Sequence, residues 1–396
     1  MRLGSASGGA AMSRESDRLY RDRRLLVVFG VTLNAIMGVT SIAPALPAMA
    51  RALGVGSNEI ALVITAFTLP GAFLAPLVGV LSDRYGRVEV LVPSLLIFGC
   101  AGLACFFVKS FELLLVLRFL QGIGATGLGI LNITIIGDLF AGRRRTAALG
   151  YNASILNAGS MLYPAIGGLL ASIGWNYPFL LSAAAFPVAI LALLHLRYPK
   201  PRGAGGFREY ASGALNLMRR KRMLALFTIT LLAFVMLYGP YLTCMPLILD
   251  ERGIGSREIG ALMSLAPLTT VLVSSQFGRI TRAYEIKRLV GTACIFYLLF
   301  VAIAPRVSSV ETAIVAALLF GAAHGLNLPS IHSLVVSLAP PEYRGVVTSI
   351  NGMMLRAGQT IGPVLVALLA GSLGLANAFY SIALLPPLML LALLAL

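Results

Sequence analysis

The sequence predicts an all-α membrane protein with twelve transmembrane helices arranged in two pseudo-symmetric bundles of six. Hydrophobic residues make up 58% of the 396 residues and charged residues only 12%, and the mean hydropathy is +0.89. A soluble core of this size does not need so much apolar surface. Twelve apolar runs are long enough for the roughly 20 helical residues that cross a bilayer. The two halves of the chain also repeat one another.

The apolar runs follow one another through short connections, which leave no room for a large soluble domain. None shows the alternating segments of about ten residues that are typical of a transmembrane barrel. We expect the twelve spans at 25–48, 58–82, 88–108, 111–138, 145–173, 176–196, 223–248, 257–281, 289–306, 309–337, 345–373 and 376–396.

The one long connection lies between the sixth and seventh spans and marks a domain boundary. It is rich in Pro and Gly and ends in a basic run at 219–222. Apolar residues recur within it at helical spacing, which predicts an amphipathic helix on the cytoplasmic membrane surface. The predicted organisation is a cytoplasmic tail at 1–24, a first bundle at 25–197, this linker at 198–222 and a second bundle at 223–396. The last span stops at Leu396 while still apolar, so we expect a polar tail to be missing there.

An internal repeat supports two halves of six spans. A shift of 199 residues without a gap superposes four pairs of identical residues: Arg145 and Arg344, Asn152 and Asn351, Gly159 and Gly358, and Pro164 and Pro363. Transporters built from such repeats carry their site near the midplane, between the repeats.

The formal net charge of +16 comes from 31 Lys and Arg against 15 Asp and Glu. Most of the basic residues lie in alternate connections, whereas a nucleic-acid-binding protein would gather them on one face. Because Lys- and Arg-rich loops stay in the cytoplasm, we expect a bacterial-type inner-membrane protein with both termini inside. The polar segment 1–24 has no small-residue cleavage site and is interpreted as a disordered tail rather than a signal peptide. The four cysteines lie in apolar spans and match no metal spacing.

A charged connection at 79–91 separates the second and third spans. It resembles the signature loop of the major facilitator superfamily of secondary transporters, at Gly79, Leu81, Asp83, Arg84, Gly86, Arg87 and Leu91. Val88 departs from that pattern, in which a Lys or Arg is usual. The resemblance implies that Asp83 meets the amino-terminal end of the eleventh helix near Gly345 and that the loop arginine meets Asp138. These contacts would hold the two halves together on the cytoplasmic side.

Two further spans resemble motifs of the same family. The fourth span matches its second motif at Leu114, Arg118, Gln121, Gly122, Gly124 and Ala125. The fifth span is similar to the motif that the family associates with antiporters, at Gly150, Gly159, Pro164, Gly167 and Gly168, with Tyr163 in place of a glycine. The resemblance implies the twelve-span drug:proton antiporter branch, with export or exchange as the activity.

The sequence has no Asp or Glu in the middle of any span, so the buried ionisable groups are basic. A charge inside the bilayer costs about 2.5 to 3.5 kcal/mol on insertion scales, so Arg118 and Arg356 need partners or water. Arg356 is either a packing residue satisfied by carbonyls or an anchor for an anionic or zwitterionic substrate. His324 lies in a Gly- and Pro-interrupted stretch. It is either hydrogen-bonded across helices or the proton carrier, since its unperturbed pKa is about 6.5.

We therefore predict three sets of functional residues and no metal or cofactor site. Substrate contacts are expected at Asn34, Met37, Arg118, Asn132, Asn157, Met161, Tyr163, Tyr238, Tyr241, His324, Asn327, Arg356 and Gln359. Gating is expected from Gly79, Asp83, Arg84, Gly86, Arg87, Asp138 and Gly345. Proton coupling is expected from Arg118, His324 and Asp83.

The predicted function is proton-coupled efflux of amphipathic small molecules by a monomeric transporter through alternating access. One alternative is transport of an organic anion or a zwitterionic, lipid-like metabolite anchored by Arg356. Another is a transporter fold used as a sensor or scramblase without coupled transport. The expected partners are the substrate, protons and the lipid bilayer, and not nucleic acid. No Walker loop, nucleophile elbow or metal cluster in the sequence indicates an enzyme.

Overall fold

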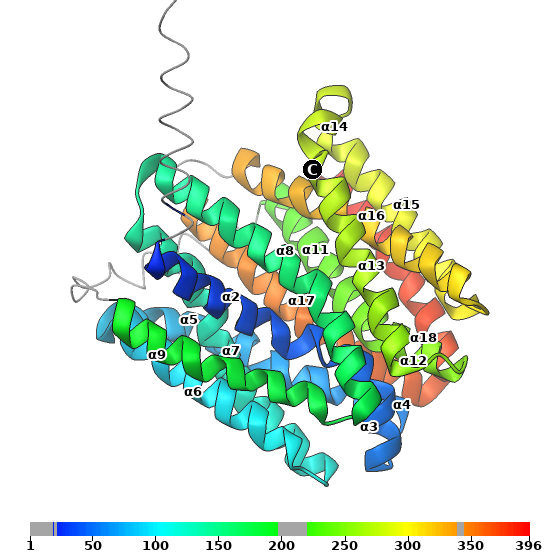
Figure 1. The fold of residues 1–396 in the computed structure, drawn as a ribbon. Helices are drawn as coiled ribbons and strands as arrows, with labels where there is room; N and C mark the ends of the chain where they lie inside the picture. The colour runs from blue at the N-terminus through cyan, green and yellow to red at the C-terminus, as the bar shows by residue number, and fades with distance from the viewer. Residues whose placement is uncertain (1–18, 20–21, 197–219, 339–343) are drawn as a thin grey trace, which may run out of the picture.

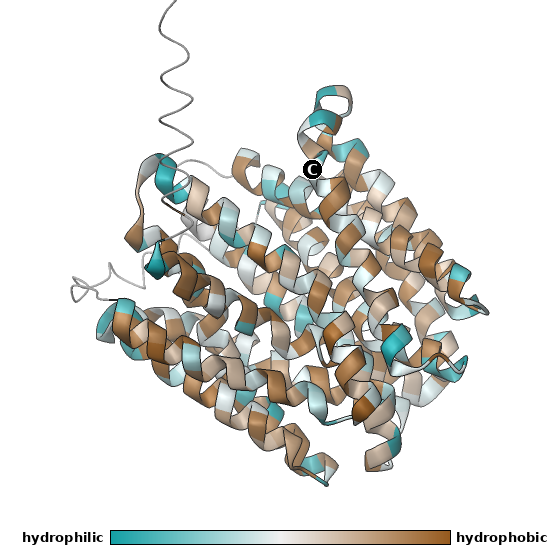
Figure 2. Cartoon of the chain, viewed as in Figure 1, coloured by the Kyte–Doolittle hydropathy of each residue, from teal (hydrophilic) through white to brown (hydrophobic). Residues whose placement is uncertain are grey.

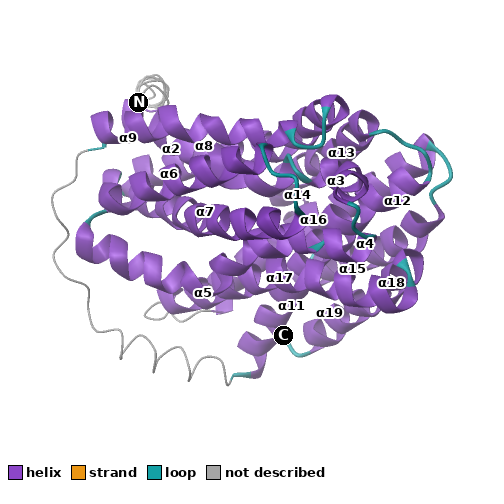
Figure 3. Cartoon of the chain, turned by 90° about the horizontal axis from the view of Figure 1, so that it is seen from below, coloured by secondary structure: helices purple, strands orange, loops and turns teal. Residues whose placement is uncertain are grey.

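The structure is a computed structural model that describes residues 19, 22–196, 220–338 and 344–396, and the side chains of 344–346 are not among those described. Within these ranges the chain is helical throughout and contains no strand (Figure 3). Most of the tail predicted at 1–24 lies outside the described residues, but its last two residues are already helical, because the first helix begins at Arg23 rather than at 25. The amphipathic helix expected in the linker lies outside the described residues and stays a prediction.

The first half of the chain forms six membrane spans, some of them built from more than one helical segment (Figure 1). Its elements are α2 (Arg23–Thr40), η1 (Ala43–Ala45), α3 (Leu46–Leu53), α4 (Ser57–Ile60), α5 (Leu62–Tyr85), α6 (Arg87–Phe106), α7 (Phe111–Leu139), α8 (Gly142–Ile173), η2 (Tyr177–Ala184) and α9 (Ala185–His195).

The second half repeats this arrangement with six more spans. Its elements are α11 (Lys221–Met236), the π-helical η3 (Leu237–Cys244), α12 (Met245–Glu251), α13 (Ser256–Ser275), α14 (Phe277–Ala283), α15 (Ile286–Ile303), η4 (Ala304–Arg306), α16 (Val310–Leu338), α17 (Arg344–Leu373), α18 (Leu375–Ser381), η6 (Ile382–Leu384) and α19 (Leu385–Leu394). In Figure 3, α6, α7 and α9 lie on one side of the molecule and α12, α15 and α18 on the other.

The described helices include twelve that are long and apolar enough to cross a membrane, which confirms the predicted fold class. Several predicted boundaries are wrong. The first span continues to Leu53 and the seventh to Glu251, because Pro47 and Pro246 lie in the first turn of α3 and α12, where proline is tolerated. The eighth span ends at Ser275, and what was predicted as its last turn is part of the separate helix α14.

Apolar residues predominate along the long helices, and polar residues are frequent at the helix ends and connections (Figure 2). We call the end of the bundle where α5 turns into α6 and where α14 lies the basic end, and the opposite end, where α3 meets α4, the far end. Asp22 caps α2 at the basic end by accepting from the backbone N–H of Arg24 at 3.0 Å. The hydrogen bond from the Arg24 guanidinium lowers the pKa of Asp22.

A pair of polar contacts recurs in both halves. The Thr32 hydroxyl of α2 donates to Asn152 Oδ1 of α8 at 2.6 Å, and the Thr230 hydroxyl of α11 donates to Asn351 Oδ1 of α17 at 2.7 Å. The two pairs connect the first span of each half to the fifth. Each half therefore contains the same Thr–Asn contact at equivalent positions. This agrees with the sequence match at Asn152 and Asn351.

The two halves meet along two helix pairs, α5 with α17 and α8 with α13. The second pair approaches closely at the far end, where a β-carbon on Gly168 would lie 2.4 Å from the Ser256 carbonyl oxygen and 2.8 Å from Gly260 Cα. Nearer the basic end, a β-carbon on Gly150 of α8 or on Gly79 of α5 would meet no described atom within 4 Å. The halves are therefore held together most tightly at the far end.

Candidate functional site

Arg356 lies on α17 where the second half faces the first. A β-carbon on Gly129 of α7 would lie 2.2 Å from Arg356 Nη2, and one on Gly71 of α5 would lie 3.6 Å from its Cδ. Two glycines of the first half thus leave the space that this long side chain occupies. The guanidinium reaches across the boundary between the two halves.

The polar contacts of Arg356 are few. Its Nη1 donates to Gln359 Oε1 at 3.4 Å, and no ion pair joins it to a carboxylate among the described residues. Gln359 Nε2 in turn donates to the Tyr238 hydroxyl of η3 at 3.0 Å. The Thr68 hydroxyl of α5 lies 3.4 Å from the Gln359 carbonyl oxygen. These four residues form a polar cluster between the halves, which we call the boundary cluster.

The boundary cluster includes a π-helical turn. Tyr238 lies in η3, in which Pro240 interrupts the regular helix of the seventh span. Such turns often occur at functional sites, because they change the direction of side chains along a helix. Gly239 also allows close packing here, since a β-carbon on it would lie 2.9 Å from the Gly362 carbonyl oxygen of α17.

Arg118 lies in the interior of the first half and is fully buried. Its Nη2 donates to the Gly38 carbonyl oxygen at 2.8 Å, its Nε to that of Val63 at 3.2 Å and its Nη1 to Gln121 Oε1 at 2.7 Å. The ring of Phe67 lies 4.2 Å from its guanidinium carbon, in cation–π geometry. Arg118 thus ties α7 to α2 and α5 in this conformation, without contacting a carboxylate.

The other predicted substrate residues of the first half divide into buried and partly buried side chains. Asn34 and Asn132 are buried, and each has an amide oxygen without a hydrogen-bond partner in the described part of the chain. Asn34 Nδ2 donates to the Gly30 carbonyl oxygen at 2.9 Å, and Asn132 Nδ2 donates to Thr32 at 3.2 Å. Met37 is also buried, whereas the partly buried side chains are those of Asn157, Met161 and Tyr163 on α8.

His324 lies inside the second half, on α16. Its Nδ1 is 2.8 Å from the Tyr297 hydroxyl of α15, and its ring packs against Phe234 of α11 and Phe320 of α16. Asn327 lies one turn further along α16 and beside Tyr297, fully buried, with neither amide atom in a hydrogen bond. The ring contacts of His324 are all to residues of the second half.

Tyr241 belongs to the same aromatic cluster. It donates from its hydroxyl to the Met263 carbonyl oxygen at 2.5 Å, and its ring stacks on Phe320 with centroids 4.3 Å apart. The sequence pattern placed His324, Asn327 and Tyr241 with Arg356 in one set. In the structure the described contacts of these three residues are all to residues of the second half, so a common substrate site with Arg356 stays a prediction.

The predicted gating loop forms a compact cluster at the basic end. Arg87 Nε donates to Asp138 Oδ2 of α7 at 2.9 Å, and its Nη1 contacts Asp83 and the Ser82 hydroxyl. The contact expected between the loop arginine and Asp138 is therefore present. Arg84 is exposed and lies over the Tyr85 ring.

The backbone of this loop needs a glycine at one place. Gly86 has φ of +118°, and a β-carbon there would lie 2.0 Å from a Glu89 carboxylate oxygen. An L side chain would be strained in that conformation, so Gly86 allows α6 to begin directly after α5. Gly345 lies in the first turn of α17. The expected contact between Asp83 and this end of the helix is not among the described contacts and stays a prediction.

Sequence reasoning missed several partners. Arg51 of α3 forms an ion pair with Asp250 of α12 at the far end, beside a hollow of about 330 Å³. The two residues lie 199 positions apart, which is the offset of the internal repeat. A search for opposite charges at repeat-equivalent positions could therefore have predicted this pair. Phe67 and Tyr297, which contact Arg118 and His324, gave no comparable signal because their partners depend on how the helices are rotated.

The comparison with known protein families agrees with this architecture. The family model described as Major Facilitator Superfamily matches residues 28–282 and 241–396. The chain belongs to the Major Facilitator Superfamily. This superfamily member is therefore a transporter with twelve membrane spans rather than an enzyme.

Similar proteins include named exporters and resistance proteins. The chain is 35% identical to the bacillibactin exporter of Bacillus subtilis over 164 residues, 40% of this chain and 41% of that protein. It is 25% identical to the quinolone resistance protein NorA of Staphylococcus aureus over 228 residues, 56% of this chain and 58% of that protein. It is 22% identical to multidrug resistance protein 2 of B. subtilis over 339 residues, 84% of each chain. The first two matches thus span about half of those relatives.

Solved structures share the fold. The nucleoside transporter NupG superposes with a TM-score of 0.75 at 14% identity, covering 94% of this chain and 98% of that one. A transporter of the POT family in complex with 5-aminolevulinic acid gives a TM-score of 0.78 at 15% identity, covering 94% and 95%. At this level of identity the likeness establishes the fold alone.

Proposed function

We propose that this superfamily member is a proton-coupled antiporter that exports amphipathic small molecules by alternating access. It would act as a monomer in the bacterial inner membrane, with the basic end and both termini in the cytoplasm. The observation that carries the proposal is the asymmetry of the boundary between the halves. The halves touch through Gly168 and Gly260 at the far end, whereas β-carbons on Gly150 and Gly79 would meet no described atom within 4 Å. We propose that this conformation is the one open to the cytoplasm.

Rocking of the two halves explains transport in this scheme. Each half is tied internally, the first through Arg118 and the second through the Tyr241–Phe320 aromatic stack. The contacts between the halves at Gly168 and Gly260 involve small residues, which let the two helix backbones approach closely. Two rigid halves that exchange contacts at one end for contacts at the other would expose the boundary cluster to each side in turn.

The export direction is supported by the names of the similar proteins, which include an exporter and two resistance proteins. Amphipathic substrates are supported by the composition of the boundary, where Tyr238 and Gln359 offer hydrogen bonds next to apolar helices. The partly buried Met161 and Tyr163 add surface that can re-pack around different ligands.

A second candidate substrate class follows from Arg356. A guanidinium between the halves without a carboxylate partner in the described chain is suited to an organic anion or a zwitterion. A substrate carboxylate or phosphate could accept two parallel hydrogen bonds from it. Under this alternative, Arg356 binds the charged group, and Gln359 and Tyr238 orient the rest.

For the coupling ion, we propose His324 as the proton-binding group. It is buried next to the Tyr297 hydroxyl, and the unpartnered Asn327 amide lies one turn away, so a change in its charge would disturb a dry part of the second half. Asp83, the other titratable candidate, contacts Arg87 at the basic end. Arg118 contributes by stiffening the first half, since its donors already have carbonyl acceptors.

Purified protein in proteoliposomes tests the proposal. A pH difference should drive accumulation or extrusion of a fluorescent cationic drug, and His324→Gln should remove the dependence on the pH difference. Arg356→Gln should leave drug transport largely intact but abolish transport of an anionic dye, and Arg282→Gln, on the exposed helix α14, serves as the charge-matched control. Drug movement that ignores the pH gradient in the unmodified protein would contradict proton coupling. Absence of any substrate movement would favour a sensor or scramblase.

A further inference from the structure

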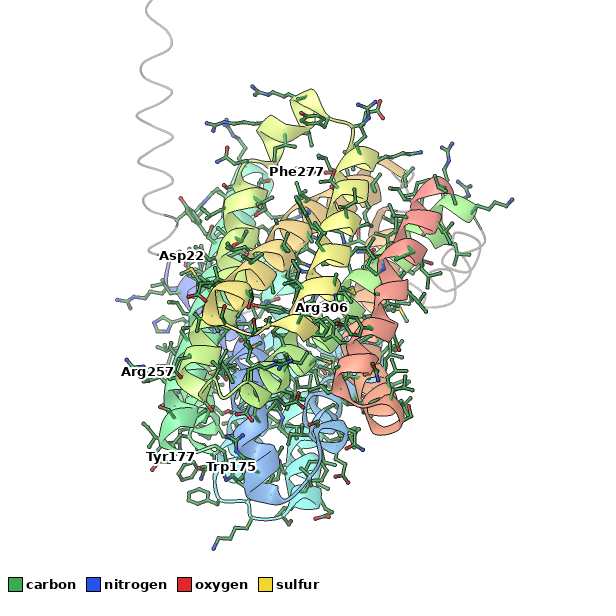
Figure 4. The ribbon with its side chains drawn as sticks, turned by 90° about the vertical axis from the view of Figure 1, so that its right-hand side faces the viewer. Asp22, Trp175, Tyr177, Arg257, Phe277 and Arg306 are labelled. Atoms are coloured by element: carbon green, nitrogen blue, oxygen red, sulfur yellow. The ribbon has the colours of Figure 1, made fainter. Side chains whose placement is uncertain are left out.

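A crevice lies on the outside of the second half, between α15 and the α18–η6 segment. It has a volume of about 510 Å³, and its lining includes Ile295, Leu299, Ala302, Arg306, Tyr380 and Ala383. All of these except Arg306 are apolar or aromatic. In Figure 4, Arg306 is labelled on the side of the second half that is turned toward the viewer.

The crevice faces the bilayer rather than another part of the protein. Ile295 is 54% exposed and Leu299 43% exposed, on a helix that crosses the membrane. Lipid must therefore fill it, since water is absent at this depth. From Ile295 to Arg306 the helix rises about 16 Å, which matches the half-thickness of a bilayer with a core of about 30 Å. One acyl chain of a single leaflet fits that length.

Arg306 lies at the membrane boundary, because α15 ends at Ile303 after crossing from the basic end. Its Nη1 donates to the Ala302 carbonyl oxygen at 2.9 Å, and its guanidinium carbon lies 5.3 Å from the centre of the Tyr380 ring. These two contacts hold the plane of the guanidinium in place. Its Nε and Nη2 donors make no hydrogen bond within the described chain, so they are available to a ligand.

A second guanidinium lies at the same corner. Arg252 Nη2 donates to the carbonyl oxygen of Pro305, the residue that precedes Arg306. Neither arginine forms an ion pair with a carboxylate among the described residues, and Glu311, which follows on α16, is not within 4 Å of Arg306. The corner therefore combines two positive charges with an apolar crevice that points into the bilayer.

We propose that this crevice binds one anionic phospholipid, with an acyl chain along α15 and its phosphate on Arg306. An Arg near a membrane surface attracts anionic lipid with about 1 kcal/mol, which corresponds to roughly a fivefold preference. A lipid with a choline headgroup would carry a cation into a corner that already has two. The site is independent of the boundary cluster, so it stands or falls separately from the transport proposal.

Native mass spectrometry of the full chain in detergent tests this site. Phosphatidylglycerol should bind about fivefold more tightly than phosphatidylcholine with the same acyl chains. Arg306→Gln should remove that preference, whereas Arg306→Lys should keep most of it. Arg257→Gln removes the same charge from an exposed position at the far end, on α13 and outside the crevice, and should change nothing (Figure 4).

Ala302→Leu tests the acyl-chain part of the site, because it fills the crevice without removing a charge. It should weaken binding of both lipids. Inorganic phosphate at 10 mM should not displace phosphatidylglycerol. Equal effects of the Arg306→Gln and Arg257→Gln variants would overturn the proposal. The proposal would also be overturned if phosphate displaced the lipid completely and Ala302→Leu had no effect on binding. The site would then bind free anions rather than a lipid. Melting temperature of each variant confirms that it is folded.

Discussion

Arg51 at the end of α3 pairs with Asp250 at the end of α12, and this ion pair joins the two halves at the far end. The two residues are 199 positions apart, so they are equivalent in the internal repeat. Equivalent positions of two related halves meet one another only close to the pseudo-twofold axis. Two identical charged residues at such positions would repel each other. Arg51 and Asp250 carry opposite charges, so the contact between them is attractive.

Neutralising this pair should favour opening of the far end. The side chains of Arg51 and Asp250 are 62% and 21% exposed, and pairs of this kind contribute about 0.2 to 1 kcal/mol. Asp250→Asn should therefore raise the population of the state open at the far end by about 1.5- to 5-fold. Double electron–electron resonance between spin labels at Ala52 and Arg257, in a chain with the exposed Cys100 replaced, measures this population.

The charge-swapped double variant, Arg51→Asp with Asp250→Arg, is the control for that experiment. It keeps an ion pair across the axis and should return the label distances to those of the unmodified chain. If the double variant opens the far end as much as Asp250→Asn alone, the pair does not hold the halves together.

A larger side chain at Gly168 should prevent the far end from closing. A β-carbon there would lie 2.4 Å from the Ser256 carbonyl oxygen, which is backbone and cannot rotate away. Overpacking of this kind costs about 1 to 3 kcal/mol, so Gly168→Leu should lengthen the label distance at the far end and slow transport. Gly150→Leu on the same helix is the matched control for the far-end label distance, because in this conformation a β-carbon there meets no described atom within 4 Å. Similar behaviour of the two variants would refute the close contact.

A methyl group at Gly129 should displace the Arg356 guanidinium without unfolding the protein. The added carbon would lie 2.2 Å from Arg356 Nη2, the mobile end of a side chain, so that the arginine moves and α7 does not. Affinity for an anionic dye should fall about tenfold, which is about 1.4 kcal/mol. Isothermal titration of the purified protein measures it. The control is Gly137→Ala on the same helix, where the added carbon would meet no described atom within 4 Å. Unchanged dye affinity in Gly129→Ala would count against Arg356 as the anchor.

Replacing Arg118 should destabilise the first half. Arg118→Met keeps most of the volume but leaves the carbonyl oxygens of Gly38 and Val63 and the Gln121 amide without their donor. Unsatisfied buried groups cost about 1 to 3 kcal/mol each, so the three acceptors predict a loss of at least about 3 kcal/mol. Thermal or denaturant unfolding in detergent measures it, with Arg84→Met as the exposed control. A variant that is as stable as the control but inactive would instead point to a direct part in coupling.

Much of the fold could be predicted from the sequence, because its signals are local. The apolar runs gave the twelve spans, and the Arg145–Arg344 and Asn152–Asn351 matches gave the two halves. The contact between Arg87 and Asp138 followed from the resemblance of the loop at 79–91. The predicted spans ended at 48 and 248 and so missed the last turns, which extend to Leu53 and Glu251 in the short helices α3 and α12.

The candidate site could be predicted only in part. Arg356 and Gln359 are in the boundary between the halves, as expected for substrate-binding residues. Arg118 and His324 were grouped with them because both are basic and buried, but Arg118 faces the carbonyls of its own half and His324 the Tyr297 hydroxyl. The position of a charged residue in an apolar span indicates that its side chain lies inside the membrane. It does not indicate which neighbouring helix the side chain faces.

The sequence by itself determined that the protein lies in a membrane, how many spans it has and that its halves repeat. Each of these depends only on the composition and order of residues along the chain. Only the tertiary structure decided which side chains meet: Arg51 with Asp250 across the axis, Arg356 in the space left by Gly129, and His324 enclosed in aromatic rings. These contacts depend on how each helix is rotated about its own axis and on which helices lie beside it. The rotation and the neighbours of a helix are set by the packing of all twelve spans.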